Sequence, residues 1–157
     1  MEKLIIVAGS PNTGKTITTN LVVCKLLERG YAPDIHSIDS DKFLKRLSSG
    51  ERDKLKIGGF VILEKNGKKI VVISFGDIVV DIDVVIKEID FSDIYCLVCC
   101  SHSTRGKKVF DYLHNFIQKI DIDNVDILPI YKNLICGHGR DYKENEQLSR
   151  IIVEWID

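Results

Sequence analysis

The residues with the clearest chemistry lie near the start of the chain, in Gly9-Ser10-Pro11-Asn12-Thr13-Gly14-Lys15-Thr16. Two glycines bracket the segment, and the spacing is G-x-x-x-x-G-K-T. Such a loop turns successive backbone N–H groups inward, and the helix that follows adds partial positive charge at the same place. Lys15 would bring a full positive charge to the β- and γ-phosphates of a nucleotide, and the Thr16 hydroxyl is placed to bind Mg²⁺. These residues predict a phosphate-binding loop, although a coincidental turn between a strand and a helix is the alternative.

The predicted loop lies between a strand and a helix, which is the context that a phosphate-binding loop requires. Leu4–Ala8 has the length and composition of a buried strand, and an amphipathic helix is expected from about Lys15 to Arg29. Ile17 is the first apolar residue on the inward face of this helix, and its backbone would border the bound phosphates. Gly30 is placed to end the helix in a left-handed conformation.

The rest of the chain alternates strand and helix patterns, which predicts one α/β domain over residues 1–157. The five apolar runs expected as parallel strands are Lys3–Ala8, Asp34–Asp39, Lys69–Ser74, Ile94–Cys100 and Asp126–Tyr131. Two further amphipathic helices are expected at about Arg105 to Ile120 and Glu144 to Ile156. Asn66-Gly67 suits a two-residue turn between Phe60–Lys65 and Lys68–Ser74, so the third strand should have an antiparallel hairpin partner at the sheet edge.

The motif at Gly9–Thr16 resembles that of the P-loop nucleoside triphosphate hydrolase superfamily. The resemblance covers the whole chain in the order of its elements, and Gly9–Thr16 is its only specific motif. It implies a three-layer αβα fold with a mainly parallel five-stranded sheet plus the antiparallel edge strand. It also implies a nucleoside triphosphate with Mg²⁺, and either hydrolysis or transfer of the γ-phosphate to an unidentified acceptor.

Two branches of the superfamily fit, and the choice between them stays open. A strand ending in Asp39-Ser40-Asp41 looks like the acidic pair of small-metabolite kinases. The run from Gly14 to Leu21, followed by Arg29-Gly30-Tyr31, looks like the partition-type ATPases, although this chain has Ser10 where they carry an extra lysine. The D-x-x-G and N-K-x-D motifs of small GTPases are absent, which favours ATP over GTP.

A carboxylate at the carboxyl edge of the sheet is expected to order Mg²⁺ or to accept a proton from the nucleophile. Asp39 and Asp41 would follow the second strand, and Asp77 would follow the third. Asp39 and Asp77 are therefore candidate metal ligands and, with Asp41 and Lys15, candidate catalytic residues. Each aspartate could instead cap a turn or a helix.

Positive charge is also needed against the charge that develops on the phosphate. Arg105 follows the fourth strand and is a candidate catalytic residue, and Arg140 lies in a glycine-containing loop that could cover the base. Either arginine could equally be an exposed surface residue.

The segment Lys42–Lys56 carries an excess of basic residues and contains Ser48-Ser49-Gly50. One interpretation is a solvated helix and loop. The other is a basic flap that closes over an anionic ligand, with its hinge at the serine and glycine residues.

Five cysteines are expected to be reduced, buried thiols. Cys96 and Cys99 should point to opposite faces of a strand and so could not share a metal. If the fourth and fifth strands were neighbours, Cys100, His102, Cys136 and His138 could form a Cys₂His₂ zinc site, but core thiols and loop histidines are the simpler interpretation.

The composition narrows the class of protein. Of the 157 residues 45% are hydrophobic, which suffices for the core of one domain. Lys and Arg number 22 against 23 Asp and Glu, so neither nucleic acid nor a membrane is an expected partner. We expect no signal peptide after Met1, and we expect a cytoplasmic protein. Its function would be that of an ATPase or phosphotransferase, or alternatively of a regulatory nucleotide-binding module that acts through a partner with negligible turnover.

Overall fold

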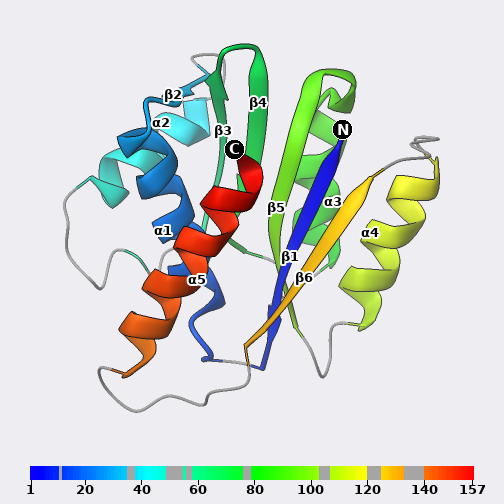
Figure 1. Cartoon of the computed structure of the whole chain (residues 1–157). Coiled ribbons are helices and arrows are strands. Elements are labelled where there is room, and N and C mark those ends of the chain that lie inside the picture. The colour runs from blue at the N-terminus through cyan, green and yellow to red at the C-terminus, as the bar shows by residue number, and fades with distance from the viewer. Residues whose placement is uncertain are drawn as a thin grey trace.

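A computed structural model provides the structure of the chain (Figure 1). It describes residues 1–10, 12–34, 38–48, 55, 58–75, 79–102, 107–119, 125–132 and 140–157. These residues form an α/β structure in which one mixed sheet lies between two layers of helices.

The sheet of the described residues has six strands in the order β2-β3-β4-β5-β1-β6. They are β1 (Lys3–Gly9), β2 (Ala32–Pro33), β3 (Phe60–Lys65), β4 (Lys68–Ile73), β5 (Ile94–His102) and β6 (Asp126–Lys132). The neighbours β4, β5, β1 and β6 are mutually parallel, whereas β3 pairs antiparallel with both β2 and β4. The first strand of the chain therefore lies inside the sheet, between β5 and β6.

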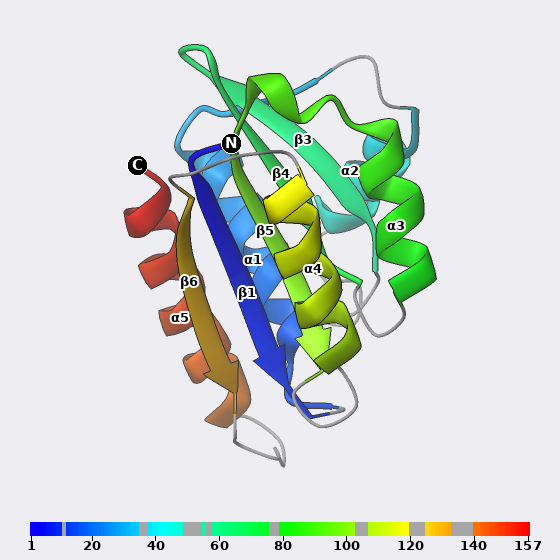
Figure 2. The same cartoon turned by 90° about the vertical axis from the view of Figure 1, so that its right-hand side faces the viewer.

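Helices cover both faces of the sheet. They are α1 (Lys15–Glu28), α2 (Ile38–Leu47), α3 (Val79–Glu88), α4 (Lys107–Lys119) and α5 (Arg140–Ile156). Figures 1 and 2 show α1, α2 and α5 on one face of the sheet and α3 and α4 on the other. In the described ranges, no helix has the length and apolar character needed to cross a membrane.

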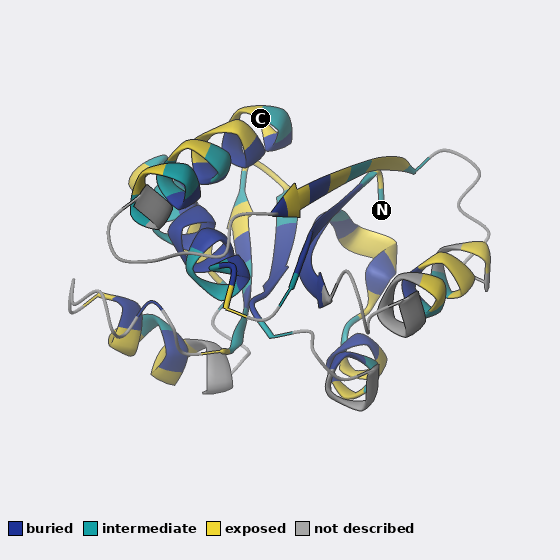
Figure 3. Cartoon of the chain, turned by 90° about the horizontal axis from the view of Figure 1, so that it is seen from below, coloured by how far each residue is buried: buried dark blue, intermediate teal, exposed yellow. Residues whose placement is uncertain are grey.

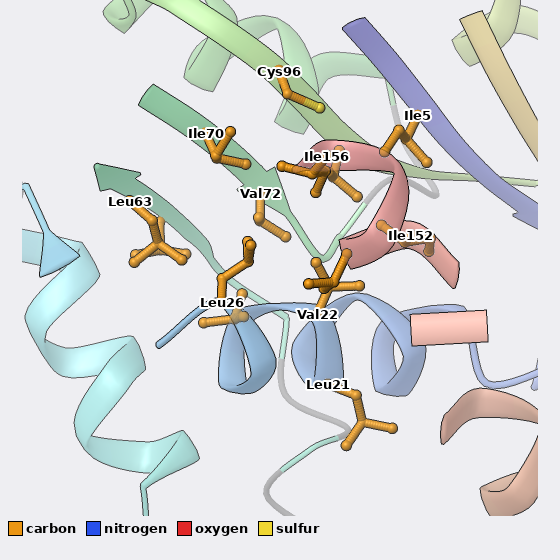
Figure 4. Packing of buried hydrophobic residues seen from close by; sticks show 14 of the residues in the cluster. Ile5, Leu21, Val22, Leu26, Leu63, Ile70, Val72, Cys96, Ile152 and Ile156 are labelled. Carbon is orange, nitrogen blue, oxygen red and sulfur yellow. The ribbon is translucent and has the colours of Figure 1, made fainter. Parts of the chain in front are cut away.

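Side-chain alternation along the strands creates a separate core on each face. On one face, Ile5 and Val72 pack with Val22 of α1 and Ile152 of α5, as Figure 4 shows. On the other face, residues one position along, such as Ile6 and Ile73, pack against α3 and α4. Burial on both faces explains why these strands read as continuous apolar runs in the sequence.

The end of α5 is fixed to the start of β1. The Lys3 ammonium donates to the Trp155 carbonyl at 2.7 Å and also lies 5.1 Å from the centre of the Trp155 ring. A cation at this position satisfies a carbonyl in the last turn of the helix and complements the negative end of its dipole.

The hairpin predicted around Asn66-Gly67 is confirmed. β3 and β4 pair antiparallel, and both turn residues have positive φ, 53° at Asn66 and 78° at Gly67, as a type I′ turn requires. However, β3 is not the edge strand, because the two residues of β2 pair with its outer side.

The predicted parallel strand at 34–39 is wrong. The chain leaves the sheet after β2, with one further hydrogen bond from the Asp34 amide to the Ile62 carbonyl at 2.9 Å. Ile38 already begins α2, which buries Phe43 and Leu47 at helical spacing. That amphipathic pattern outweighs the short apolar run before it, and Pro33 suits an edge strand because it lacks an N–H group.

The basic segment 42–56 is not simply a solvated face. Its first part belongs to α2, and Leu55 is buried in the core, with its carbonyl accepting from Asn20 Nδ2 at 2.8 Å. Residues 49–54 and 56–57 lie outside the described residues, and they include Ser49 and Gly50 of the expected hinge.

Candidate functional site

The carboxyl end of β1 lies at a position where α/β proteins commonly bind ligands. In register, Gly9 is opposite His102 of β5 on one side and Lys132 of β6 on the other. The helix after β1 packs on one face of the sheet and the helix after β5 on the opposite face. Adjacent parallel strands whose helices diverge in this way leave a crevice beyond their carboxyl ends. Figure 3 looks at this edge of the molecule from below.

The backbone after β1 is shaped by left-handed residues. Asn12 has φ 63° and Gly14 φ 80°, while Thr13 between them is not left-handed. Alternation of this kind directs neighbouring N–H groups toward the same side and creates a concave site for an anion. We refer to residues 9–16 as the 9–16 loop; Pro11 within it lies outside the described residues.

The start of α1 is suited to negative charge. Its N-cap is Gly14, which has no side chain to accept from the N–H groups of the first turn, and that turn contains no acidic residue. The first N–H groups of a helix have no acceptor within the helix, and the helix dipole places partial positive charge there.

Lys15 lies at the centre of the loop. Its ammonium donates to the Gly9 and Ser10 carbonyls, both at 3.1 Å, and the residue is only 7% exposed. The Thr13 hydroxyl donates to the same Ser10 carbonyl at 2.8 Å. A buried ammonium needs such acceptors because loss of hydration is costly. The loop thus holds a full positive charge at the helix start.

Both glycines are required by the structure of the loop itself. A Cβ at Gly9 would lie 2.5 Å from Thr13 Oγ1 and 2.8 Å from the Lys132 carbonyl oxygen. A Cβ at Gly14 would lie 2.7 Å from Asn145 Nδ2, in addition to the strain of its left-handed backbone.

A buried polar network supports the loop from α5 and β6. Asn145 Oδ1 accepts from Lys132 Nζ at 2.6 Å and from the Thr18 hydroxyl at 3.0 Å. Lys132 is 1% exposed, and its ammonium lies 3.6 Å from Glu144 Oε2. The network joins α1, α5 and β6, and its Asn145 side chain lies against Gly14.

The sequence interpretation missed this network. Its signal was present, because Asn145 lies three residues before Leu148 and seven before Ile152, on the inward face of α5. A polar residue at an inward position of an amphipathic helix indicates a buried hydrogen bond.

The other predicted loop residues lie as follows. Thr16 and Ile17, both half-buried, are the second and third residues of α1, and Ile17 packs against the core. The Thr16 carbonyl accepts from the Thr19 hydroxyl at 3.1 Å.

The structure changes the setting of the candidate aspartates. Asp39 and Asp41 lie within the first turn of α2 rather than at the end of a parallel strand. Asp41 is exposed and its carboxylate accepts from Lys45 Nζ at 2.6 Å, a pairing typical of a helix surface. The side chain of Asp39 and the whole of Asp77 lie outside the described residues.

The two candidate arginines are not both in loops. Arg140 is the first residue of α5 and directly follows residues 133–139, which lie outside the described residues, so its role at the base remains a prediction. Its side chain is not among those described, and Arg105 lies outside the described residues. The glycines at 137 and 139 do not stop a helix from beginning at the next residue.

The cysteines behave as core residues in the described part of the chain. Cys96 and Cys99 belong to the cores on opposite faces, as their spacing predicts. Burial raises the pKa of Cys96 to about 12, so its thiol stays protonated. Because β1 separates β5 from β6, the strand neighbours assumed for a zinc site are wrong. The described residues contain no group of three or more metal-binding side chains, and Cys136 and His138 are outside them.

Comparisons with known proteins identify no relative. No family model matches the chain, and no curated protein or solved structure matches it. What can be inferred about function therefore comes from the sequence motif and from the geometry described above.

Proposed function

We propose that this chain binds a nucleoside triphosphate with Mg²⁺ at the 9–16 loop, and that it hydrolyses the nucleotide or transfers its γ-phosphate. The observation that carries the proposal is the buried Lys15 ammonium at the start of α1, surrounded by left-handed backbone at Asn12 and Gly14. Positive charge, the start of a helix and glycine-allowed close approach coincide at one point, and all three favour a phosphate group.

Nucleotide binding would replace the present hydrogen-bond acceptors of the Lys15 ammonium with phosphate oxygens. In the structure Lys15 donates to the Gly9 and Ser10 carbonyls. Phosphate oxygens would replace these neutral carbonyls, and hydrogen bonds between two charged groups are about twice as strong as those between neutral groups. Because Lys15 is already held at the loop, little side-chain entropy remains to be lost on binding.

Thr16 fits the role of a Mg²⁺ ligand, because it is half-buried in the first turn of α1 directly after Lys15. Mg²⁺, when bound, would neutralise charge on the β- and γ-phosphate oxygens. Asp77, which follows β4, remains the carboxylate candidate at the sheet edge, and Asp39 remains a second candidate from α2. ATP is the nucleotide proposed, because guanine-reading motifs are absent from the sequence.

A regulatory module with negligible turnover is the second candidate function. One observation favours it: the Asp41 carboxylate, proposed as a catalytic group, is paired with Lys45 on the exposed surface of α2. Such a protein would bind the nucleotide at the same loop and differ only in the chemical step.

The test is a calorimetric titration of the protein with ATP, with Mg²⁺ present and then removed by a chelator. We expect saturable binding that weakens without Mg²⁺, and ATP binding at least as tight as GTP binding. AMP, which lacks the β- and γ-phosphates, is the matched control and should bind much more weakly. Equal binding of AMP and ATP, or no binding, contradicts the proposal, and phosphate release then separates the enzyme from the regulatory module.

A further inference from the structure

A second concave site, which shares no residue with the 9–16 loop, lies where β4 ends and β3 begins. It is a cavity of about 530 Å³, open to solvent, between α2 and α3. Figure 2 shows these two helices on opposite sides of the β3–β4 hairpin. We call it the α2–α3 pocket; its lining residues are Lys42, Phe43, Arg46, Gly58, Gly59, Phe60, Phe75, Val84 and Val85.

The floor of the α2–α3 pocket is held by hydrogen bonds. The buried Ser74 side chain bonds both backbone polar groups of Gly59: Ser74 Oγ donates to the Gly59 carbonyl and accepts from the Gly59 N–H, each at 2.9 Å. The Ser74 amide also donates to the Gly59 carbonyl at 2.8 Å. This backbone is therefore pre-formed, which reduces the ordering cost of binding a ligand.

Two aromatic rings approach this floor because it is built from glycines. A Cβ on Gly59 would overlap the ring of Phe43, and a Cβ on Gly58 would lie 3.2 Å from Phe75 Cβ. Phe60 contributes a third ring, and it and Phe75 are each half-buried, so part of each residue remains accessible. Phenyl faces and edges of this kind suit a flat or apolar ligand body.

The rim of the α2–α3 pocket is positively charged. Lys42 and Arg46 are four residues apart on α2, so they lie on the same face of that helix, and both are exposed. Among the described residues that line the pocket, these two are cationic and none is acidic. Apolar walls with a few charged groups at the opening are the usual composition of a small-molecule site.

We propose that the α2–α3 pocket binds a small amphipathic anion, with an apolar or aromatic body against the three phenylalanines and a carboxylate, sulfonate or phosphate group facing Lys42 and Arg46. The volume falls within the range of about 300 to 1,000 Å³ that holds such ligands. This inference does not depend on nucleotide binding at the 9–16 loop, because the two sites share no residue.

The test uses two fluorescent probes of nearly the same shape. 8-Anilinonaphthalene-1-sulfonate carries a sulfonate, and N-phenyl-1-naphthylamine lacks it. We expect the anionic probe to bind the wild-type protein saturably with one site. The variant Lys42→Gln/Arg46→Gln should weaken it about tenfold, since hydrogen bonds to charged groups are the strong ones, and should weaken the neutral probe no more than about twofold.

The matched control removes the same charge elsewhere. Lys143→Gln/Arg150→Gln changes two exposed cations of α5 and should leave both probes unaffected. A further variant, Val84→Glu, adds a carboxylate at a lining position that is 52% exposed, so it should fold normally and weaken only the anionic probe. Because partly unfolded proteins also bind such dyes, each variant is first checked for a cooperative thermal transition.

Amide chemical shifts locate the bound probe. The amide signals of Gly58 and Gly59 should shift on titration, while those of Gly9 and Gly14 should not. The proposal is overturned if the anionic probe does not bind saturably, if the α2 and α5 double variants weaken it equally, or if the shifts concentrate outside the α2–α3 pocket.

Discussion

The 9–16 loop and the α2–α3 pocket achieve concavity by opposite means. At the loop, the surface is backbone: left-handed residues, a helix start and one buried ammonium, supported by the polar network of Asn145, Lys132 and Thr18. At the pocket, the surface is made of phenyl rings, with cations at the opening. Backbone N–H groups fit one kind of ligand atom, an anionic oxygen, whereas rings and flexible cations accept many shapes.

The two sites should therefore be sensitive to different kinds of substitution. A site made of backbone is damaged by changes that move the backbone or its buried supports, even when the changed residue never contacts the ligand. A site made of side chains is tuned by replacing those side chains, while the fold tolerates the change.

The largest effect is expected from Lys15→Ala. Removal of the ammonium takes away the only full positive charge that the described part of the loop contains, and Mg·ATP affinity should fall about a hundredfold. Lys87→Ala, which changes an exposed lysine of α3, is the control and should bind as wild type. Titration calorimetry measures both. A folded Lys15→Ala protein with unchanged affinity would falsify the proposed function.

Asn145→Ala should destabilise the fold by about 2 to 3 kcal/mol. It removes the amide oxygen that accepts from both the Lys132 ammonium and the Thr18 hydroxyl, and the loss of one charge-assisted and one neutral buried hydrogen bond costs about this much. Gln147→Ala, at an exposed position of the same helix, should change stability by less than about 0.5 kcal/mol. Urea denaturation gives both values.

A double-mutant cycle sharpens this test. If Asn145 and Lys132 act as one unit, Lys132→Met combined with Asn145→Leu should cost clearly less than the sum of the two single changes, because the hydrogen bond between the two side chains can be lost only once. Additive costs would mean that the network does not support the loop as a unit.

In the pocket region, Gly59→Ala should cost about 2 kcal/mol, because the new methyl group overlaps the Phe43 ring. Gly67→Ala is the matched comparison, since it has φ 78° but no atom within 4 Å of the new methyl group. Only backbone strain then remains, and the expected cost is about 1 kcal/mol. Thermal unfolding measures the difference, and Phe43→Leu should recover part of the Gly59→Ala loss. Equal costs at the two glycines would remove the steric explanation.

The smallest expected effect is on the pH dependence of stability, through the ion pair of Lys25 and Glu146. Lys25 Nζ donates to Glu146 Oε1 at 2.5 Å between α1 and α5, and this hydrogen bond lowers the pKa of Glu146 below its usual 4.5. A lowered pKa stabilises the folded state above pH 4.5, and the stabilisation is lost as the pH falls through the lower folded value. Lys25→Met should therefore cost up to about 1 kcal/mol at pH 7 and progressively less in acid.

The control for this prediction is a pair in the pocket region. Asp41 and Lys45 form an exposed pair on α2, and Lys45→Met should have no measurable effect at any pH. Chemical denaturation at a series of pH values compares the two variants. A Lys25→Met deficit that does not shrink in acid would show that the Glu146 ion pair is not its cause.

Sequence patterns predicted the elements with strong local signals. β1, α1 and the β3–β4 hairpin follow from an apolar run, helical periodicity and the Asn66-Gly67 turn, each of which acts over a few residues. The strand expected at 34–39 failed because a short apolar run fits a strand and a helix start equally well, and Phe43 and Leu47 decide it by packing.

The sites were only partly accessible from sequence. The 9–16 loop is a contiguous motif, so its residues could be named. The supports at Lys132 and Asn145 come from distant elements, and the neighbours of β1 depend on strand order, which local patterns do not encode. For the α2–α3 pocket, an anion entered only one of the two interpretations of the basic segment 42–56, as the ligand of a flap. The rings of Phe60 and Phe75 come together only through the hairpin.

The interior position of β1 has a consequence for the order of events during synthesis. Lys3 pairs with Cys96 and with Asp126, so both neighbours of this strand are made long after it. An amino-terminal fragment without β5 and β6 has no partners for β1, and its apolar residues would stay exposed on the ribosome. Contacts so distant in sequence also slow folding. The strand β1 is thus made well before either of its neighbours, and its native environment is complete only after β5 and β6 have been added.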